Sequence, residues 1–329
     1  MATEPDEHEH EHDEHDEHDE HEHEHAHGSH AGHGHHAPPD KMTRAFAIGI
    51  ALNISFVVIG IIAGAVARST ALLADAAHNL GDVLGLGMAW GAAALARRAT
   101  TSRRTYGLRR TTILSALANG GLVLFAIGGV GWEAILRLKT PAPVDGGIVA
   151  VVATIGVVLN GVSATLFAKG RKRDINVRGA FLHLIADAAV SGGVLVAGLL
   201  IWQTGWMWID PATSLVVSAT ILFGSYKLVR EALDLLLDAV PPHIDADAVE
   251  TYLASLPEVR AVHDLHVWSM STTEVALTCH LVLPWPAVQP TFQHTIQDEL
   301  EHRFGIHHIT IQFEDCVRVQ CAQAAPESL

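Results

Sequence analysis

Two short stretches of this sequence place ionisable side chains inside long apolar runs. The first is STALLADAAHNLGD, in which His78 and Asp82 are four residues apart, and the second is FLHLIADAAVSGG, in which His183 and Asp187 repeat that spacing. Residues four apart lie on one face of a helix. Two such helices would offer two imidazoles and two carboxylates, a set of ligands that suits a tetrahedral divalent cation, zinc above all.

Ionisable side chains at membrane depth are costly, by roughly 3 kcal/mol or more each, so they indicate a functional site. Hydrogen bonding between neutral groups on neighbouring helices is the alternative. The identical spacing on two separate stretches favours the metal site. Asp75 shares the helix face of His78 and has three open interpretations: a partner that orients His78, a proton acceptor near the site, or an acid at a helix end.

Apolar residues are concentrated between about residues 45 and 237 of a chain of 329 residues that is 49% hydrophobic. This composition predicts a polytopic α-helical membrane protein and excludes an ordinary soluble domain. Each of six segments is long enough to cross a hydrocarbon core of ~30 Å. We expect these spans at about residues 45–67, 70–95, 112–136, 146–168, 179–202 and 208–237.

Local residues refine this expectation of six spans. The pairs Gly60/Gly64 and Gly81/Gly85 would let neighbouring helices approach closely. Asp210-Pro211 is expected in the first turn of the sixth span, where proline is favoured. Basic residues gather in the loops after the second and fourth spans, so these loops should be cytoplasmic. Six spans then place both termini in the cytoplasm, and we expect the plasma (inner) membrane.

The composition changes after Pro241-Pro242 to that of a soluble domain. Its pattern predicts the order helix, strand, strand, helix, strand, at about residues 245–256, 259–269, 275–283, 288–304 and 308–313. Side chains from adjacent strands could converge on a second metal ion, although a surface histidine is more often only solvated. The candidate ligands are His263, His266, His280, His307, His308 and Glu314.

The first 36 residues hold 13 acidic residues and no lysine or arginine, and they supply most of the net charge of −15. Their His, Asp and Glu repeats predict disorder. They are either a flexible, low-affinity metal collector or a solvated polyanion. HEHEH at His8–His12 and His21–His25 matches the metalloprotease pattern HExxH, but a repetitive tract produces it by chance.

The three cysteines, Cys279, Cys316 and Cys321, show no disulfide framework and suit a reducing cytoplasm. Cys316 and Cys321 could add soft ligands to a metal site, although their spacing is not CxxC.

The sequence resembles the cation diffusion facilitator family, of the zinc-transporter type of cation/proton antiporter. The resemblance covers about residues 42–316 and rests on the two His-x-x-x-Asp blocks, on RRTYGLRR in the basic loop, on WIDPATSLVVS in the sixth span and on VHDLHVWSMS in the soluble domain. It implies a homodimer of six-span protomers with cytoplasmic ferredoxin-like α+β domains that bind metal and dimerise.

The resemblance also implies two metal sites. The transport site would consist of His78, Asp82, His183 and Asp187 and would take zinc, with cobalt or cadmium possible. The cytoplasmic site would consist of His263, His280, His307 and Glu314. Some members have a further site in the loop after the second span. Here the loop Arg97–Arg110 contains no His or acid, so we expect that site to be missing.

These expectations combine in an efflux transporter, not an enzyme, that exchanges a cytoplasmic divalent cation for protons by alternating access. Metal ions and protons compete for imidazole and carboxylate groups. Membrane lipid would be a partner and nucleic acid would not. The alternative is a membrane-embedded zinc sensor or scaffold that does not transport. An intramembrane metalloprotease ranks last, because HExxH occurs in none of the spans.

Four domains are expected. They are a disordered tail (1–42), a transmembrane domain (43–238), a cytoplasmic metal-binding and dimerisation domain (239–320) and a C-terminal tail (321–329).

Overall fold

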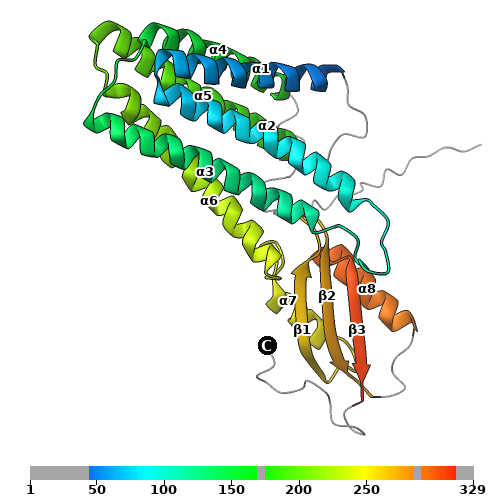
Figure 1. The fold of residues 1–329 in the computed structure, drawn as a ribbon. Coiled ribbons are helices and arrows are strands. Elements are labelled where there is room, and N and C mark those ends of the chain that lie inside the picture. The colour runs from blue at the N-terminus through cyan, green and yellow to red at the C-terminus, as the bar shows by residue number, and fades with distance from the viewer. Residues whose placement is uncertain (1–43, 169–174, 285–289, 316–329) are drawn as a thin grey trace, which may run out of the picture. The chain divides into compact units, whose positions relative to one another are not determined.

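The computed structural model describes residues 44–168, 175–284 and 290–315 of the chain. Six long helices come first: α1 (Arg44–Ala67), α2 (Thr70–Ala96), α3 (Thr111–Lys139), α4 (Gly146–Phe167), α5 (Ile175–Thr204) and α6 (Ile209–Leu236). They are followed by α7 (Ala246–Ala254), β1 (Ala261–Ser269), β2 (Val275–Val282), α8 (Pro290–Phe304) and β3 (His308–Glu314), as Figure 1 shows. The expected spans and the αββαβ order therefore match the observed elements to within a few residues at each end.

The expected tails, residues 1–42 and 321–329, lie outside the described residues, as do the basic residues Lys169–Arg173 and both Cys316 and Cys321.

Four of the helices are long and apolar enough to cross a membrane, by length and composition: Thr111–Lys139, Gly146–Thr165, Arg178–Thr204 and Ile209–Leu236. Helix α1 contains a shorter apolar stretch, Asn53–Ala67. Large apolar side chains point outward from the helices, among them Phe125 (83% exposed) and Phe223 (79% exposed). Such a surface would be unfavourable in water and suits lipid.

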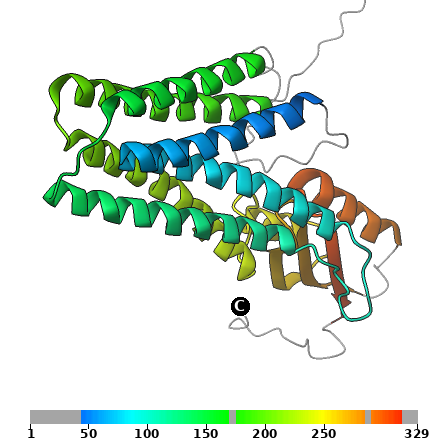
Figure 2. The ribbon, with the colours of Figure 1, turned by 45° about the horizontal axis from the view of Figure 1, so that its top comes forward.

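Glycines allow α2 to approach its two neighbours in the sequence, α1 and α3, which lie beside it in Figures 1 and 2. A Cβ at Gly60 would lie 3.1 Å from the Cβ of Ala76, and one at Gly64 2.9 Å from Leu73. A Cβ at Gly81 would lie only 2.5 Å from Val123. Both glycine pairs that the sequence singled out are therefore contact points between helices.

Helix α6 holds the first turn of α2 through Asp210, whose side chain is fully buried. Its carboxylate accepts hydrogen bonds from the Ser69 hydroxyl (2.5 Å), the Thr70 hydroxyl (2.8 Å) and the Thr70 backbone N–H (2.7 Å). The Ser214 hydroxyl donates to the Thr70 carbonyl (3.1 Å). A carboxylate at this position pairs with backbone donors that a helix N-terminus leaves unsatisfied. Asp210 thus fixes the helix that carries His78 and Asp82.

The C-terminal part contains a three-stranded sheet in the order β1-β2-β3, with β1 antiparallel and β3 parallel to β2. Alternate residues of β2, including Val275, Leu277 and Leu281, pack with residues of α7 and α8 in one apolar core. Because successive side chains of a strand point to opposite faces, His280 lies on the other face of the sheet.

A bulge in β1 decides which face His263 occupies. The pairing of β1 with β2 shifts between His263 and His266, and Asp264 between them has a φ of +53°. Val262, Leu265 and Val267 all pack with the core, so the strict alternation breaks between Val262 and Leu265. The extra residue brings His263 directly opposite His280 on the open face.

We predict that Asp210→Ala destabilises the protein, because it leaves buried donors of Ser69 and Thr70 without an acceptor. The expected cost is about 1.5–3 kcal/mol. It would be measured as a lower unfolding temperature in detergent. Asp210→Asn, which keeps one acceptor oxygen, should lose less. Asp234→Ala, an exposed acid on the same helix, is the control and should change little. Equal stability of Asp210→Ala and the unmodified protein would contradict this role.

We also predict that alanine at Asp264 destabilises the sheet more than glycine does. Both substitutions remove the carboxylate, but alanine disfavours a positive φ by about 1–2 kcal/mol whereas glycine adopts it readily. Amide hydrogen exchange in β1 and β2 should therefore be faster in Asp264→Ala than in Asp264→Gly. The control is Ala261, an exposed residue of the same strand. There Ala261→Gly should make amide exchange faster, because glycine weakens an ordinary strand position. Equal exchange in both Asp264 variants would show that the bulge does not need this conformation.

Candidate metal centre

The four side chains that the sequence singled out within the apolar stretches meet between α2 and α5. His78 Nε2 lies 3.1 Å from Asp187 Oδ1 and 3.7 Å from Asp82 Oδ2. His183 Nε2 lies 3.4 Å from Asp187 Oδ2 and 3.6 Å from Asp82 Oδ2. Each imidazole nitrogen therefore has a carboxylate oxygen from its own helix and one from the other helix beside it.

These separations fit a small tetrahedral cation. Ligand atoms about 2.0–2.2 Å from a zinc ion are about 3.3–3.6 Å apart along the edges of a tetrahedron. The four nitrogen–oxygen separations, 3.1–3.7 Å, bracket that range. The two rings are edge-on, with centroids 6.2 Å apart. His78, Asp82 and Asp187 offer ligand atoms that all lie within 4.8 Å of one another, and His183 lies beside these three residues, 3.4–3.6 Å from both carboxylates.

The site is open at one end. The side chains of His183 and Asp82 are 51% and 32% exposed, whereas those of His78 and Asp187 are 19% and 7% exposed. Asp75, one helical turn before His78, is buried, and the Ser191 hydroxyl lies 3.4 Å from each of its carboxylate oxygens. The ion pairs of His78 are with Asp82 and Asp187, so this arrangement lends no support to Asp75 as the group that orients the His78 ring.

A second cluster lies on the open face of the three-stranded sheet. His263 Nε2 is 3.2 Å from Glu314 Oε2, and His280 Nδ1 is 3.1 Å from Glu314 Oε1. The three side chains are 11–16% exposed, and each offers a ligand atom within 4.8 Å of the others. Each comes from a different strand. They lie near one another because His263 of β1 pairs with His280 of β2, and Glu314 of β3 pairs with Val282, two residues further along β2.

The donor set of this cluster fits a zinc ion. His280 Nδ1 is buried and makes no hydrogen bond within the described part of the chain, although it faces the Glu314 carboxylate. Two imidazoles and one carboxylate are a common set of three protein ligands for zinc, with water in the fourth position. Asp264 Oδ2 lies 3.6 Å from the other ring nitrogen of His280, where a carboxylate can fix the orientation of a metal-binding ring.

The structure does not bring His307 to this cluster. His307 is exposed and precedes β3, where its N–H donates to the Val275 carbonyl (3.2 Å). Glu314 ends β3, opposite Val282. Seven residues of extended strand, roughly 23 Å at about 3.3 Å per residue, therefore separate His307 from Glu314. His266 is exposed and contacts Asp264 (3.0 Å).

Cys279 belongs to the apolar core beneath the open face. Burial raises the pKa of its thiol to about 12. The residue therefore stays a thiol at neutral pH and offers no thiolate for a metal ion.

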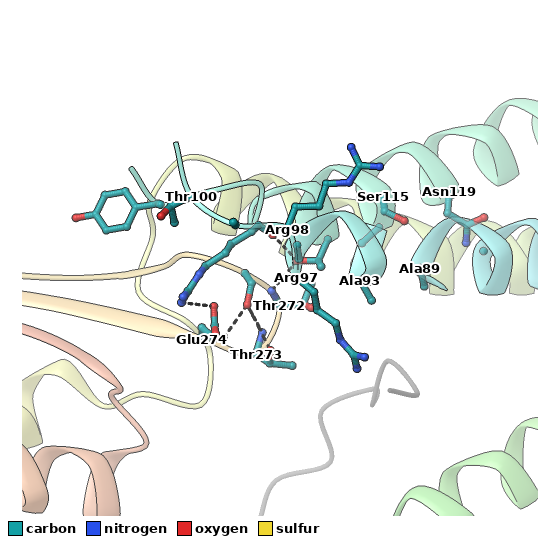
Figure 3. A pocket seen from close by; sticks show the side chains of 18 of the residues that line it. Ala89, Ala93, Arg97, Arg98, Thr100, Ser115, Asn119, Thr272, Thr273 and Glu274 are labelled. Atoms are coloured by element: carbon teal, nitrogen blue, oxygen red, sulfur yellow. Dashed lines mark hydrogen bonds and ion pairs between the residues drawn. The ribbon is translucent and has the colours of Figure 1, made fainter. Parts of the chain in front are cut away.

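A cavity of about 630 Å³ lies elsewhere, where α2 ends and α3 begins. Its lining includes Arg97, Arg98, Asn119 and the turn Ser271–Glu274, and none of the candidate metal ligands. Figure 3 shows the side chains of Arg97 and Arg98 pointing in different directions. Arg109 forms an ion pair with Glu274 (2.7 Å) in the same region. This cavity has no set of converging ligands, so the two clusters described above remain the candidate metal centres.

Both parts of the chain match models of known protein families. Residues 46–237 match the model of a cation efflux transmembrane domain, and residues 241–316 match that of the cytoplasmic domain of cation efflux proteins.

Several curated proteins are similar over most of their length. The metal cation efflux system protein CzcD of Cupriavidus metallidurans is 35% identical over 293 residues, covering 88% of this chain and 92% of CzcD. The zinc transporter ZitB of Escherichia coli is 36% identical, covering 85% and 90%. The cadmium, cobalt and zinc/H(+)-K(+) antiporter of Bacillus subtilis is 32% identical, covering 82% and 88%.

Among solved structures, the metal-bound C-terminal domain of the CzcD transporter is 36% identical, covering 22% of this chain and 99% of that domain, with a TM-score of 0.20. The family matches confirm the expected class of fold, a helical membrane domain followed by an α+β cytoplasmic domain. The chain belongs to the cation efflux family and is an integral membrane transporter of divalent metal cations, not an enzyme.

Proposed function

We propose that this protein exports cytoplasmic zinc, and by the same chemistry cadmium or cobalt, in exchange for protons. The observation that carries the proposal is the alternation of two imidazole nitrogens with the oxygens of two carboxylates, 3.1–3.7 Å apart, between α2 and α5. It is supported by relatives described as a zinc transporter and as a cadmium, cobalt and zinc antiporter. The ligands of the cargo are His78, Asp82, His183 and Asp187.

Charge balance explains why the cargo would be divalent. Asp82 and Asp187 together carry two negative charges, and neutral imidazoles add none. A dication therefore makes the site neutral, which matters because an uncompensated charge is expensive at membrane depth. Protons that enter after the metal leaves would neutralise the same carboxylates. Metal and protons thus exclude one another, which is the basis of exchange.

The two helices that share the ion have different anchors. Helix α2 is fixed to α6 through Asp210 and Ser214, and it packs against α3 at Gly81. Helix α5 packs closely on α4, where a Cβ at Gly198 would lie 2.7 Å from the backbone of Ala150. A cation bound between α2 and α5 would therefore connect two separately supported groups of helices. Movement of one group against the other would open the site alternately to each side.

The cytoplasmic cluster is proposed as a resident zinc site made of His263, His280 and Glu314. The zinc would cross-link all three strands of the sheet. The match to a cytoplasmic domain of cation efflux proteins supports metal binding and assembly as a homodimer through this domain. The N-terminal tail is proposed to collect metal. The basic loop after α2 supports a cytoplasmic location for both termini, in a protein of the plasma (inner) membrane.

We predict that His78→Ala and Asp187→Ala each abolish zinc flux while the protein still folds. Zinc, cobalt or cadmium would be added outside inverted vesicles that have an acidic lumen. Uptake of the metal would be followed with a metal-sensitive dye. The unmodified protein should take up zinc and lose this uptake when the proton gradient is collapsed. His294→Ala, an exposed histidine on α8, is the control. Full zinc uptake by either membrane variant would refute the assignment.

Substitution of the cytoplasmic ligands should have a different effect. His280→Ala and Glu314→Gln should each lower bound zinc by about one ion per chain, because each removes one of three protein ligands. The measurement is metal analysis of the full-length protein, as a difference from the unmodified chain so that binding by the tail cancels. His302→Ala, exposed on α8, should bind as much zinc as the unmodified chain. Unchanged zinc content in both ligand variants would rule out this site.

A further inference from the structure

The contacts between α2 and α5 form three successive layers. Asp82 pairs with His183, His78 with Asp187, and Asp75 with Ser191. Along α2 the residue numbers fall by four and then three, while along α5 they rise by four each time. Each step is about one helical turn, or roughly 5.4 Å. Asp75 and Ser191 therefore lie directly beyond the four ligands of the proposed transport site, on the side away from the basic loop that follows α2.

Exposure falls steadily along these layers. The side chain of His183 is 51% exposed and that of His78 is 19% exposed. Asp75 is 3% exposed and Ser191 is fully buried. The next turn of α2 is closed by Ala71 and Leu72, which are also buried. An ion that enters past Asp82 thus meets Asp75 and Ser191 last, at the sealed end of the path.

The carboxylate of Asp75 makes no ion pair with a basic side chain within the described part of the chain. The imidazole of His78, one turn away on the same helix face, attracts it when protonated, but that imidazole is already paired with Asp82 and Asp187. The side-chain contact of Asp75 is the Ser191 hydroxyl, 3.4 Å from both oxygens, and the hydrogen bond from Asn79 goes to the Asp75 backbone carbonyl. A buried carboxylate is unfavourable unless a cation or proton compensates it. Asp75 therefore shares one imidazole with two other carboxylates, and a further positive charge beside it would be favourable.

The neighbouring helices hold Ser191 against Asp75. A Cβ at Gly156 of α4 would lie 2.8 Å from the Ser191 hydroxyl and 2.8 Å from the ring of Phe56. Only glycine leaves room for the hydroxyl at this point, and Phe56 closes the pair on the α1 side. The hydroxyl and the carboxylate thus lie together inside the helix bundle, one turn from His78 and Asp187.

We propose that Asp75 and Ser191 form an outer position on the cation path, which receives the divalent cation as it leaves the four-ligand site. This inference rests on the proposed transport of zinc. The carboxylate and hydroxyl oxygens are the ligands specific to this position. Asp187, which has two oxygens and is one turn from Ser191, can stay bound while the ion moves. Overlapping ligand sets allow an ion to advance without losing all its ligands at once.

The first test compares transport with binding. Asp75→Asn keeps the shape of the side chain and removes its charge, and Ser191→Ala removes the hydroxyl. The expected result is a fall in the maximal zinc flux of about tenfold or more for Asp75→Asn, the size typical of a lost metal-site group. Zinc affinity at equilibrium should change much less, because the four inner ligands remain. Ser218→Ala, a buried serine of α6, is the matched control and should transport normally.

A second test adds a ligand. In a full-length chain whose three natural cysteines are replaced by serine or alanine, Ser191→Cys would place a thiolate at the outer position. Thiolate is a soft ligand that favours cadmium. Cadmium should then produce a sulfur-to-metal charge-transfer band in the ultraviolet, and cadmium flux should slow more than zinc flux. Ser218→Cys should show neither effect.

The outcomes separate this position from its alternatives. Wild-type zinc flux in Asp75→Asn, or the absence of the cadmium band in Ser191→Cys, would overturn the proposal. A change in Asp75→Asn confined to the pH dependence of flux would overturn it in favour of a proton site. Absence of zinc flux from the unmodified chain would contradict the proposed function. If the unmodified chain transports zinc and the variants at Asp75 and Ser191 transport it equally well, the outer position is contradicted but the proposed transport function is not.

Discussion

A carboxylate buried within a membrane needs a positive charge beside it, and the membrane half of this protein depends on how that need is met. Asp82 and Asp187 are on different helices, yet each lies within 4 Å of both imidazoles, at 3.4–3.6 Å from His183 and 3.1–3.7 Å from His78. Neutral imidazoles do not cancel the two negative charges. A dication or protons can do so, and the two compete for the same atoms. The cost of unbalanced charge thus links metal binding to proton binding.

The positions of these groups depend on contacts away from the site. Helix α2 is held at its first turn by Asp210 and along its length by close approach to α1 and α3. It approaches α5 less closely than α1 or α3, and its polar contacts with α5 are those of the candidate ligands and of Asp75 with Ser191. A helix that is firmly supported on one side and meets its partner through exchangeable groups can keep its ligands in place while the partner moves. This division of roles is what alternating access requires.

In the cytoplasmic domain one residue has a comparable influence. Strict alternation along β1 would place His263 on the same face as Leu265 and Val267, within the apolar core. The bulge at Asp264, with its positive φ, shifts the pattern by one residue and turns His263 toward His280 and Glu314. A residue in a sparsely populated conformation next to a candidate metal site is a common sign that the geometry serves the site.

Much of this protein could be predicted from its sequence because apolar length and helical spacing are local properties. The six helices, the αββαβ order, the glycine contacts and the shared face of His78 and Asp82 all follow from residues near one another in the chain. The sequence did not reveal that Asp210 caps α2, since the two are 140 residues apart. It likewise did not separate His307 from Glu314, because register between strands depends on pairing across the sheet.

Which residues could bind a metal was therefore determined by side-chain type and spacing along single helices and strands. Which of them share one ion was decided by tertiary structure, because the distances between helices and between strands are set by packing and not by the local sequence.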